Sequence, residues 1–185
     1  MKKLGWKQFV ITAGLCSLPT VASADFIATI AGNDCSGIFG QGFANCTVPA
    51  TYDPNESPVI IKFDFDGGPT EINAVLFPTI DGSEFGFSSS GSTGTWTYTQ
   101  GVGDPDINFF VAKGGNNFNL FSNLGNPTTD SWSTPLNNGG NQAGLSHLTF
   151  YDTGSTPPQE IPEPGILALL GLGLLGIGAA RRQKK

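Results

Sequence analysis

The stretch INFFVAKGGNNFNLF, residues 107–121, places two apolar runs on either side of the sequence GGNN. Glycine and asparagine adopt the backbone angles that tight turns require, and runs rich in aromatic and β-branched residues favour strands. The stretch therefore predicts a β-hairpin, with strands over residues 107–113 and 118–121.

Further short strands follow from the same reasoning. Residues 60–66 alternate, with Ile61, Phe63 and Phe65 on one face and polar side chains on the other. Residues 95–99 and 145–151 predict two more strands, and less regular patterns lie at 26–30, 71–77 and 84–87. No helical period of useful length occurs between the two ends of the chain. About seven to nine short strands predict an all-β fold, a single β-sandwich of jelly-roll-like or Greek-key form, with a short barrel as the alternative.

The C-terminus carries three features in order: the break Pro162-Glu163-Pro164, an uncharged run over 165–180, and a basic end over 181–185. Each proline fixes φ and lacks an N–H, so the break is stiff and extended. A helix over the uncharged run is about 24 Å long, which makes a short span for a bilayer core of about 30 Å. Arg181 and Arg182 begin a basic cluster that should remain cytoplasmic. A buried core helix is the alternative for this run.

Break, apolar helix and basic end together resemble the PEP-CTERM sorting signal of Gram-negative bacteria. The segments FVAKGGNNFNLF (110–121), SWST (131–134) and GLSHLTFY (144–151) resemble segments of exported proteins that carry this signal. The resemblance implies processing by an exosortase-type membrane enzyme at residues 162–164. It also implies delivery to the outer surface or to an exopolysaccharide matrix, with exopolysaccharide as a further partner. No shared biochemical activity comes with the resemblance.

The N-terminus predicts export. Three lysines precede an apolar run over 9–18, and Pro19 ends that run before the small residues Ala22 and Ala24. This pattern predicts a secretory signal peptide over 1–24 that signal peptidase cleaves after Ala24, with an uncleaved membrane anchor as the alternative. The predicted organisation is the signal peptide, a sandwich over 25–151, a linker over 152–160, and the sorting signal over 161–185.

The exported body is acidic and has one cysteine pair. Residues 25–160 contain two basic and fourteen acidic side chains, a formal charge of −12, which excludes nucleic acid as a partner. Cys35 and Cys46 remain once the signal peptide has gone, so a disulfide is expected in an oxidising compartment, with two free thiols as the alternative. A zinc site is less favoured because the chain has one histidine.

Catalysis is not expected. His147 has Ser146 beside it, but neighbours on a strand point to opposite faces and form no nucleophile–base pair. A hydrogen bond from His147 to the loop that carries Trp132 is the expected role. Two carboxylates at a suitable distance can cleave a glycosidic bond, so a secreted polysaccharide-active enzyme is the alternative. The candidate pairs are Asp64 with Asp66 and Asp104 with Asp106.

Three binding hypotheses remain open. Asp104, Asp106 and Asn108 present oxygen side chains at alternate positions and are candidate calcium ligands, although glycine is absent from position 6 of an EF-hand count. No other metal or cofactor is predicted. Carbohydrate could stack on aromatic side chains, for which the candidates are Trp96, Tyr98, Trp132 and Tyr151. A row formed by Thr95, Thr97 and Thr99 could also suggest a flat ice-binding face, although one short row without a repeat is too little to predict one.

Overall fold

The computed structural model describes residues 24–123, 125 and 128–152, and this part of the chain is all-β. Nine strands and one short 3₁₀ turn follow one another within it. They are β1 (Asp25–Ala31), η1 (Phe43–Asn45), β2 (Val59–Asp64), β3 (Glu71–Ile72), β4 (Phe85–Phe87), β5 (Thr93–Tyr98), β6 (Phe109–Gly114), β7 (Asn117–Ser122), β8 (Thr129–Ser133) and β9 (Leu145–Tyr151).

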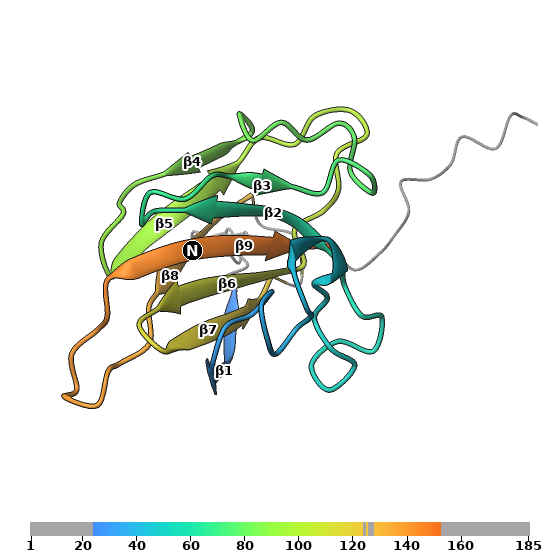
Figure 1. Cartoon of the computed structure of the whole chain (residues 1–185). Coiled ribbons are helices and arrows are strands. Elements are labelled where there is room, and N and C mark those ends of the chain that lie inside the picture. Colours follow the sequence, from blue (N-terminus) through green and yellow to red (C-terminus); the bar gives the residue numbers. More distant parts are fainter. Residues whose placement is uncertain (1–23, 124, 126–127, 153–185) are drawn as a thin grey trace, which may run out of the picture.

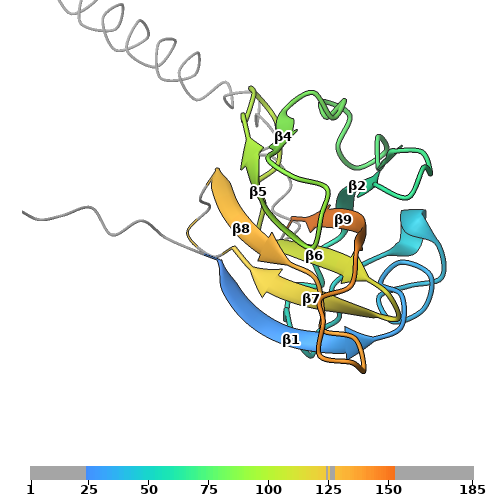
Figure 2. The same cartoon turned by 90° about the vertical axis from the view of Figure 1, so that its left-hand side faces the viewer.

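Two antiparallel sheets pack face to face (Figures 1 and 2). The larger sheet has the order β1-β7-β6-β9-β2-β3, and the smaller one has the order β4-β5-β8. The predicted β-sandwich is therefore confirmed, and the strands do not close into the short barrel that was the alternative. Whether the connections are best described as jelly-roll-like or Greek-key stays a prediction.

Between the sheets lies an aromatic core. Phe110 of β6, Phe150 of β9 and Trp96 of β5 meet there, with Trp96 edge-on to both phenylalanine rings. Phe121 of β7 stacks on Phe110 at a centroid distance of 4.7 Å. Aromatic side chains bury large apolar areas, so this cluster is the principal force that joins the two sheets.

The larger sheet is also covered on its other face. Residues 32–58 fold over β6, β7 and β9 and contribute Cys35, Phe39, Cys46 and Val48 to a second buried cluster with Val111 and Leu120. Strands β6 and β9 are therefore buried on both faces, which explains why Phe109-Phe110-Val111-Ala112 is apolar without alternation. The domain thus has three layers: the small sheet, the large sheet and the covering segment 32–58.

Strand β2 follows the predicted alternation, with one irregularity. Phe63 and Phe65 pack against the inter-sheet core, and Lys62 forms an ion pair with Glu71 at 2.8 Å. The register against β9 shifts between Val59 and Ile61, so Ile60 and Ile61 both enter the inter-sheet core. A shift of this kind adds one residue to a strand and turns its side chains to the other face.

The observed strands differ from the predicted ones in two main places, β3 and β8. The strand expected over 71–77 ends at Ile72, because Asn73 turns the chain and its side-chain amide donates to the carbonyl of Val59. Strand β8 was not predicted, since Thr129-Asp130-Ser131-Trp132-Ser133 contains one apolar side chain. That side chain, Trp132, is sufficient to fix the strand because it is buried in the inter-sheet core.

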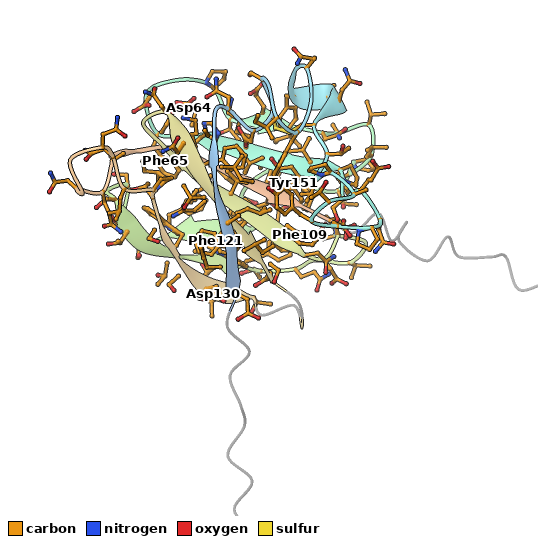
Figure 3. All side chains as sticks on the ribbon, turned by 90° about the horizontal axis from the view of Figure 1, so that it is seen from below. Asp64, Phe65, Phe109, Phe121, Asp130 and Tyr151 are labelled. Atoms are coloured by element: carbon orange, nitrogen blue, oxygen red, sulfur yellow. A yellow bond between two sulfur atoms is a disulfide. The ribbon has the colours of Figure 1, made fainter. Side chains whose placement is uncertain are left out.

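Strand pairing shows where the ends of the domain lie. Asp25 pairs with Ser122, and Phe109 pairs with Tyr151, so both ends of the described chain lie at one end of the sandwich. The β6–β7 turn and the loop before β9 lie at the opposite end, from which the β9 arrow runs in Figure 1. Figure 3 shows the same separation, with Asp64 and Phe65 remote from Phe109 and Tyr151.

Asp152 belongs to the fold, although the sequence placed it in the linker. The residue is fully buried, and its carboxylate accepts a hydrogen bond from the Asn108 amide at 3.0 Å. The rest of the predicted linker, most of the signal peptide and the whole sorting signal lie outside the described residues.

Candidate functional site

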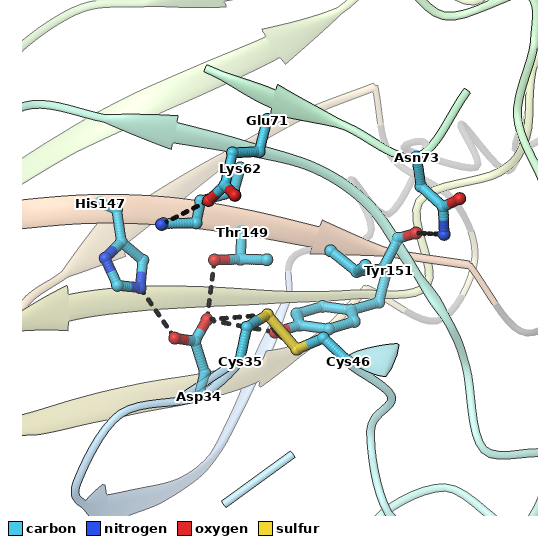
Figure 4. The surroundings of a disulfide bond; sticks show 10 residues. Asp34, Cys35, Cys46, Lys62, Glu71, Asn73, His147, Thr149 and Tyr151 are labelled. Atoms are coloured by element: carbon cyan, nitrogen blue, oxygen red, sulfur yellow. Dashed lines mark hydrogen bonds and ion pairs between the residues drawn. A yellow bond between two sulfur atoms is a disulfide. The ribbon is translucent and has the colours of Figure 1, made fainter. Parts of the chain in front are cut away.

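The carboxylate of Asp34 lies beneath the covering segment, with 1% of the residue exposed. Its Oδ1 lies 2.9 Å from Nε2 of His147, and its Oδ2 accepts hydrogen bonds from the hydroxyls of Thr149 at 2.7 Å and Tyr151 at 3.2 Å. These three partners alternate along β9, so they point to the same face of the sheet. Figure 4 shows the carboxylate between this row and the disulfide.

Opposing effects set the ionisation of this cluster. Burial alone would raise the pKa of Asp34, but the hydrogen bond and charge of His147 and the hydroxyl of Thr149 outweigh it and lower the pKa from 3.8 to about 2. Burial raises the pKa of Tyr151, and the neighbouring Asp34 carboxylate raises it further. Asp34 is therefore ionised at neutral pH, and Tyr151 keeps the proton that it donates.

A closely wound loop holds Asp34 in place. Cys35 and Cys46 form a disulfide, as the sequence predicted, and the Tyr151 hydroxyl lies 3.6 Å and 3.5 Å from their two Sγ atoms. The N–H of Phe39 donates to the Asp34 carbonyl at 2.8 Å. A Cβ at Gly40 would lie 2.2 Å from the carbonyl oxygen of Asn45, so the chain can wind this closely only with glycine there.

The observed partner of His147 corrects the sequence-based expectation. The ring bonds to Asp34 and not to the loop that carries Trp132, and the Trp132 indole N–H has no hydrogen-bond partner in the described part of the chain. Ser146 projects from the other face of β9, as predicted, because Ser146 and His147 are consecutive residues of one strand.

An aspartate that orients a histidine supplies two of the three members of a nucleophile–base–carboxylate arrangement. Within residues 24–123, 125 and 128–152, the His147 side chain is hydrogen-bonded to Asp34, and no hydroxyl or thiol joins the pair as a nucleophile. The two side chains are 9% and 2% exposed, which leaves little access for a substrate. The arrangement can therefore fix the covering segment to β9, and a chemical reaction is not evident from it.

Lys113 of β6 is a further polar side chain on the face of the large sheet that the covering segment overlies. It pairs in register with His147, is 4% exposed, and its ammonium donates a hydrogen bond to the carbonyl of Gly115. Burial lowers the pKa of Lys113, and the charges of Asp34 and Asp66 oppose that effect. The hydrogen bond from Lys113 thus stabilises the β6–β7 turn, which contains Gly115.

The candidate calcium ligands and the carboxylate pairs make local contacts. Asp104 accepts a hydrogen bond from the N–H of Gly101 at 2.7 Å, and Asp106 accepts one from the Gln100 amide at 3.0 Å. The Asn108 amide is directed to Asp152. Asp64 closes its own turn by accepting from the N–H groups of Asp66 and Gly68 at 2.9 Å. No group of three or more His, Cys, Asp or Glu side chains in the described residues is arranged to hold a metal ion.

The aromatic side chains proposed for sugar stacking are core residues. Trp96, Tyr98, Trp132 and Tyr151 are all at most 5% exposed. By contrast, Thr95 and Thr97 are exposed on the outer face of the small sheet, opposite Ser131 and Thr129 of β8. Thr95 and Thr97 therefore lie on an exposed surface, and binding of ice by this surface stays a hypothesis.

Sequence reasoning missed Asp34. One signal in the sequence could have indicated it. His147, Thr149 and Tyr151 place three polar groups two residues apart, on a strand face that the apolar pattern marks as buried. Such a row needs an acceptor from elsewhere in the chain. An aspartate next to a disulfide cysteine was an available candidate.

The sorting signal is the one part of the chain with a recognised relative. Residues 160–183 match the PEP-CTERM protein-sorting motif. This motif marks an exosortase substrate. Proteins that carry it are exported and sorted to the cell surface, and the matched residues include Pro162, Glu163, Pro164, Arg181 and Arg182.

Comparisons of the whole chain add no further relative. No curated protein matches it. No solved structure matches it either. Within the described residues no helix has the length and apolar character to cross a membrane, and the predicted span over 165–180 lies outside them.

Proposed function

We propose that this PEP-CTERM protein is a non-catalytic cell-surface or extracellular-matrix protein of a Gram-negative bacterium. The sorting motif over 160–183 is the observation that carries the proposal. In this scheme the signal peptide drives export, residues 165–180 hold the chain transiently in the inner membrane, and Arg181 and Arg182 fix its orientation. Exosortase then acts at Pro162-Glu163-Pro164 and the sandwich passes to the outer surface or the matrix.

The interior of the domain supports a non-catalytic role. The one Asp–His pair among the described residues is buried, and it joins the covering segment to β9. The carboxylates at the turns stabilise their own loops through backbone N–H groups. The disulfide closes the covering segment over the sheet, which suits a protein that must persist outside the cell.

The domain also has a geometry that suits release. Asp152, the last described residue, lies at the same end of the sandwich as Asp25, because β9 ends beside the start of β6. The chain beyond it runs only from 153 to 161 before the Pro-Glu-Pro break. A single cut at the break would therefore free the whole of the described domain.

The test replaces Pro162, Glu163 and Pro164 with alanine in the native host. The expected result is that the protein stays in the membrane fraction, whereas the unchanged protein is recovered at the surface or in the matrix. A matched control replaces Thr156, Pro157 and Pro158 with alanine, which removes two prolines from the linker and leaves the break intact. Intact mass of each fraction gives the two termini of the recovered chain.

The proposal predicts a released form that begins at Asp25 and ends near Pro162. Unchanged release of the 162–164 variant would contradict exosortase processing at the break. Equal loss of release in the linker control would show that the loss is not specific to the break, and it would contradict recognition at residues 162–164.

A further inference from the structure

A hollow opens at the end of the sandwich that is remote from both described termini. The β6–β7 turn forms one wall, and the loop before β9 forms the other. The cavity has a volume of about 630 Å³, within the range of about 300–1,000 Å³ that small-molecule sites occupy. Its lining includes Gly114, Asn116, Asn117, Leu136, Asn138 and Asn141.

Hydrogen bonds hold both walls in place. The N–H of Gly32 donates to the Asn116 carbonyl at 2.8 Å, and the Lys113 ammonium fastens the neighbouring Gly115 carbonyl. In the other wall, the Thr134 hydroxyl donates to the Ala143 carbonyl at 2.5 Å, and the N–H of Asn137 donates to the Asn141 carbonyl at 2.8 Å. The hollow is therefore formed before any ligand enters it.

The two walls meet at Gly114. A Cβ at this position would lie 2.8 Å from the carbonyl oxygen of Gly144 and 2.9 Å from Cβ of Thr134. The absence of a side chain lets the hairpin and the loop approach this closely, and Gly114 itself lines the hollow.

Asparagine dominates the lining. The side-chain amides of Asn116, Asn117, Asn138 and Asn141 make no hydrogen bond to the described residues, whereas Asn137 uses its side-chain oxygen to close its own loop. Each amide offers a carbonyl acceptor and two N–H donors, the combination that a sugar hydroxyl, itself donor and acceptor, can satisfy. Leu136, 60% exposed at the rim, supplies an apolar surface for the C–H face of a ring.

The charges in and around the hollow limit the kinds of ligand that it can bind. No acidic or basic side chain lines the hollow. The exported body carries a formal charge of −12, so its field repels anions. A neutral, hydroxyl-rich ligand fits both observations, and an anionic glycan fits neither.

We propose that this hollow binds a neutral polysaccharide through its asparagine amides. The inference rests on the proposed surface or matrix role and names the ligand class for it. The hollow lies at the end of the sandwich opposite to that of Ala24 and Asp152, so neither end of the described chain obstructs it.

Affinity gel electrophoresis of the exported protein, purified from whichever host fraction holds it, tests the proposal. The probes are dextran, laminarin and galactomannan as neutral polysaccharides, with alginate as the anionic comparison. We expect retardation by at least one neutral polysaccharide and none by alginate. Asn138→Ala with Asn141→Ala should weaken that binding by about tenfold, the effect of losing two ligand hydrogen bonds.

Asn45→Ala with Asn55→Ala is the matched control, since it removes two exposed asparagine amides that do not line the hollow. This control should bind as the unchanged protein does. No retardation by any of the neutral probes, stronger retardation by alginate, or equal binding by the N138A/N141A variant would overturn the proposal. Failure of binding with intact sorting would reject the hollow alone, and failure of sorting with intact binding would reject the release scheme alone.

Discussion

Oδ1 of Asp34 lies 2.9 Å from Nε2 of His147, which is 113 residues further along the chain. With the hydroxyl of Thr149 on Oδ2, this contact joins the covering segment to the central strand β9. The buried charge is thus compensated by donors that only the folded chain brings together.

The stability of the domain should therefore fall at low pH. The pKa of Asp34 is about 2 in the folded protein against 3.8 ordinarily, so the unfolded chain takes up the proton first as the pH falls. The stabilisation, roughly 2 kcal/mol, is complete above about pH 4 and is lost between about pH 4 and pH 2. Urea unfolding at pH 7, 4, 3 and 2 measures it.

Asp34→Asn should lower the free energy of unfolding at pH 7 by about 2–3 kcal/mol, because a neutral amide replaces the charged acceptor of three donors. Its difference from the unchanged protein should shrink at pH 2, where that carboxylate is being protonated. Asp66→Asn, at an exposed acid, is the control and should leave the pH profile as it is. An unchanged profile in the Asp34 variant would show that another group causes the acid loss.

Thr149→Val should cost about 1–2 kcal/mol, since it removes the hydroxyl that donates to Asp34 at 2.7 Å and leaves the shape of a buried side chain nearly constant. With one donor fewer, the pKa of Asp34 is lowered less, so the stability lost toward pH 2 should be smaller. Thr149→Ser keeps the hydroxyl and should retain the pH profile, although it loses a methyl group. Denaturation of the two variants across pH separates hydrogen bonding from packing.

Breaking the Cys35–Cys46 bond should lower the free energy of unfolding by about 3 kcal/mol, the loop-closure contribution for a separation of 11 residues. Urea unfolding with and without a thiol reductant measures the loss. A variant with both cysteines replaced by serine should already be at the lower stability and should not respond to the reductant. A response in that variant would place the effect of the reductant elsewhere.

Gly114→Ala should destabilise the domain by about 1–3 kcal/mol, because the new Cβ would overlap the Gly144 carbonyl and the loop would have to move. Gly144→Ala is the matched control, since a Cβ there has no neighbour within 4 Å. That control should stay within about 0.5 kcal/mol of the unchanged protein. Thermal unfolding of the two variants compares them, and equal melting temperatures would argue against the close approach at Gly114.

Much of the sandwich could be predicted from local pattern. The hairpin over 107–121, the alternation in β2 and the last strand follow from periodicity and turn residues, and these give β6, β7, β2 and β9. The disulfide followed from the pair of exported cysteines. Each of these features depends on residues that are near in sequence or on a simple count.

The covering segment and its carboxylate could not be predicted in this way. Residues 32–58 have no strand or helix period, and they are placed by contacts with β6, β7 and β9 that lie far along the chain. Asp34 is therefore identified only when β9 is known to present His147 and Thr149 to that segment. Strand β8 could not be predicted for a related reason, since its one apolar side chain, Trp132, is identified as a core residue only by its contacts in the folded domain.

The start of β1 limits when maturation can occur. The N–H of Ala24 donates to the Asp130 carboxylate, and Asp25 is already paired with Ser122. A protease must draw residues on both sides of its target bond into an extended cleft, and Ala24 and Asp25, which flank the proposed cleavage bond, are held against β8 and β7. In the proposed scheme, signal peptidase would therefore cleave after Ala24 before this strand docks.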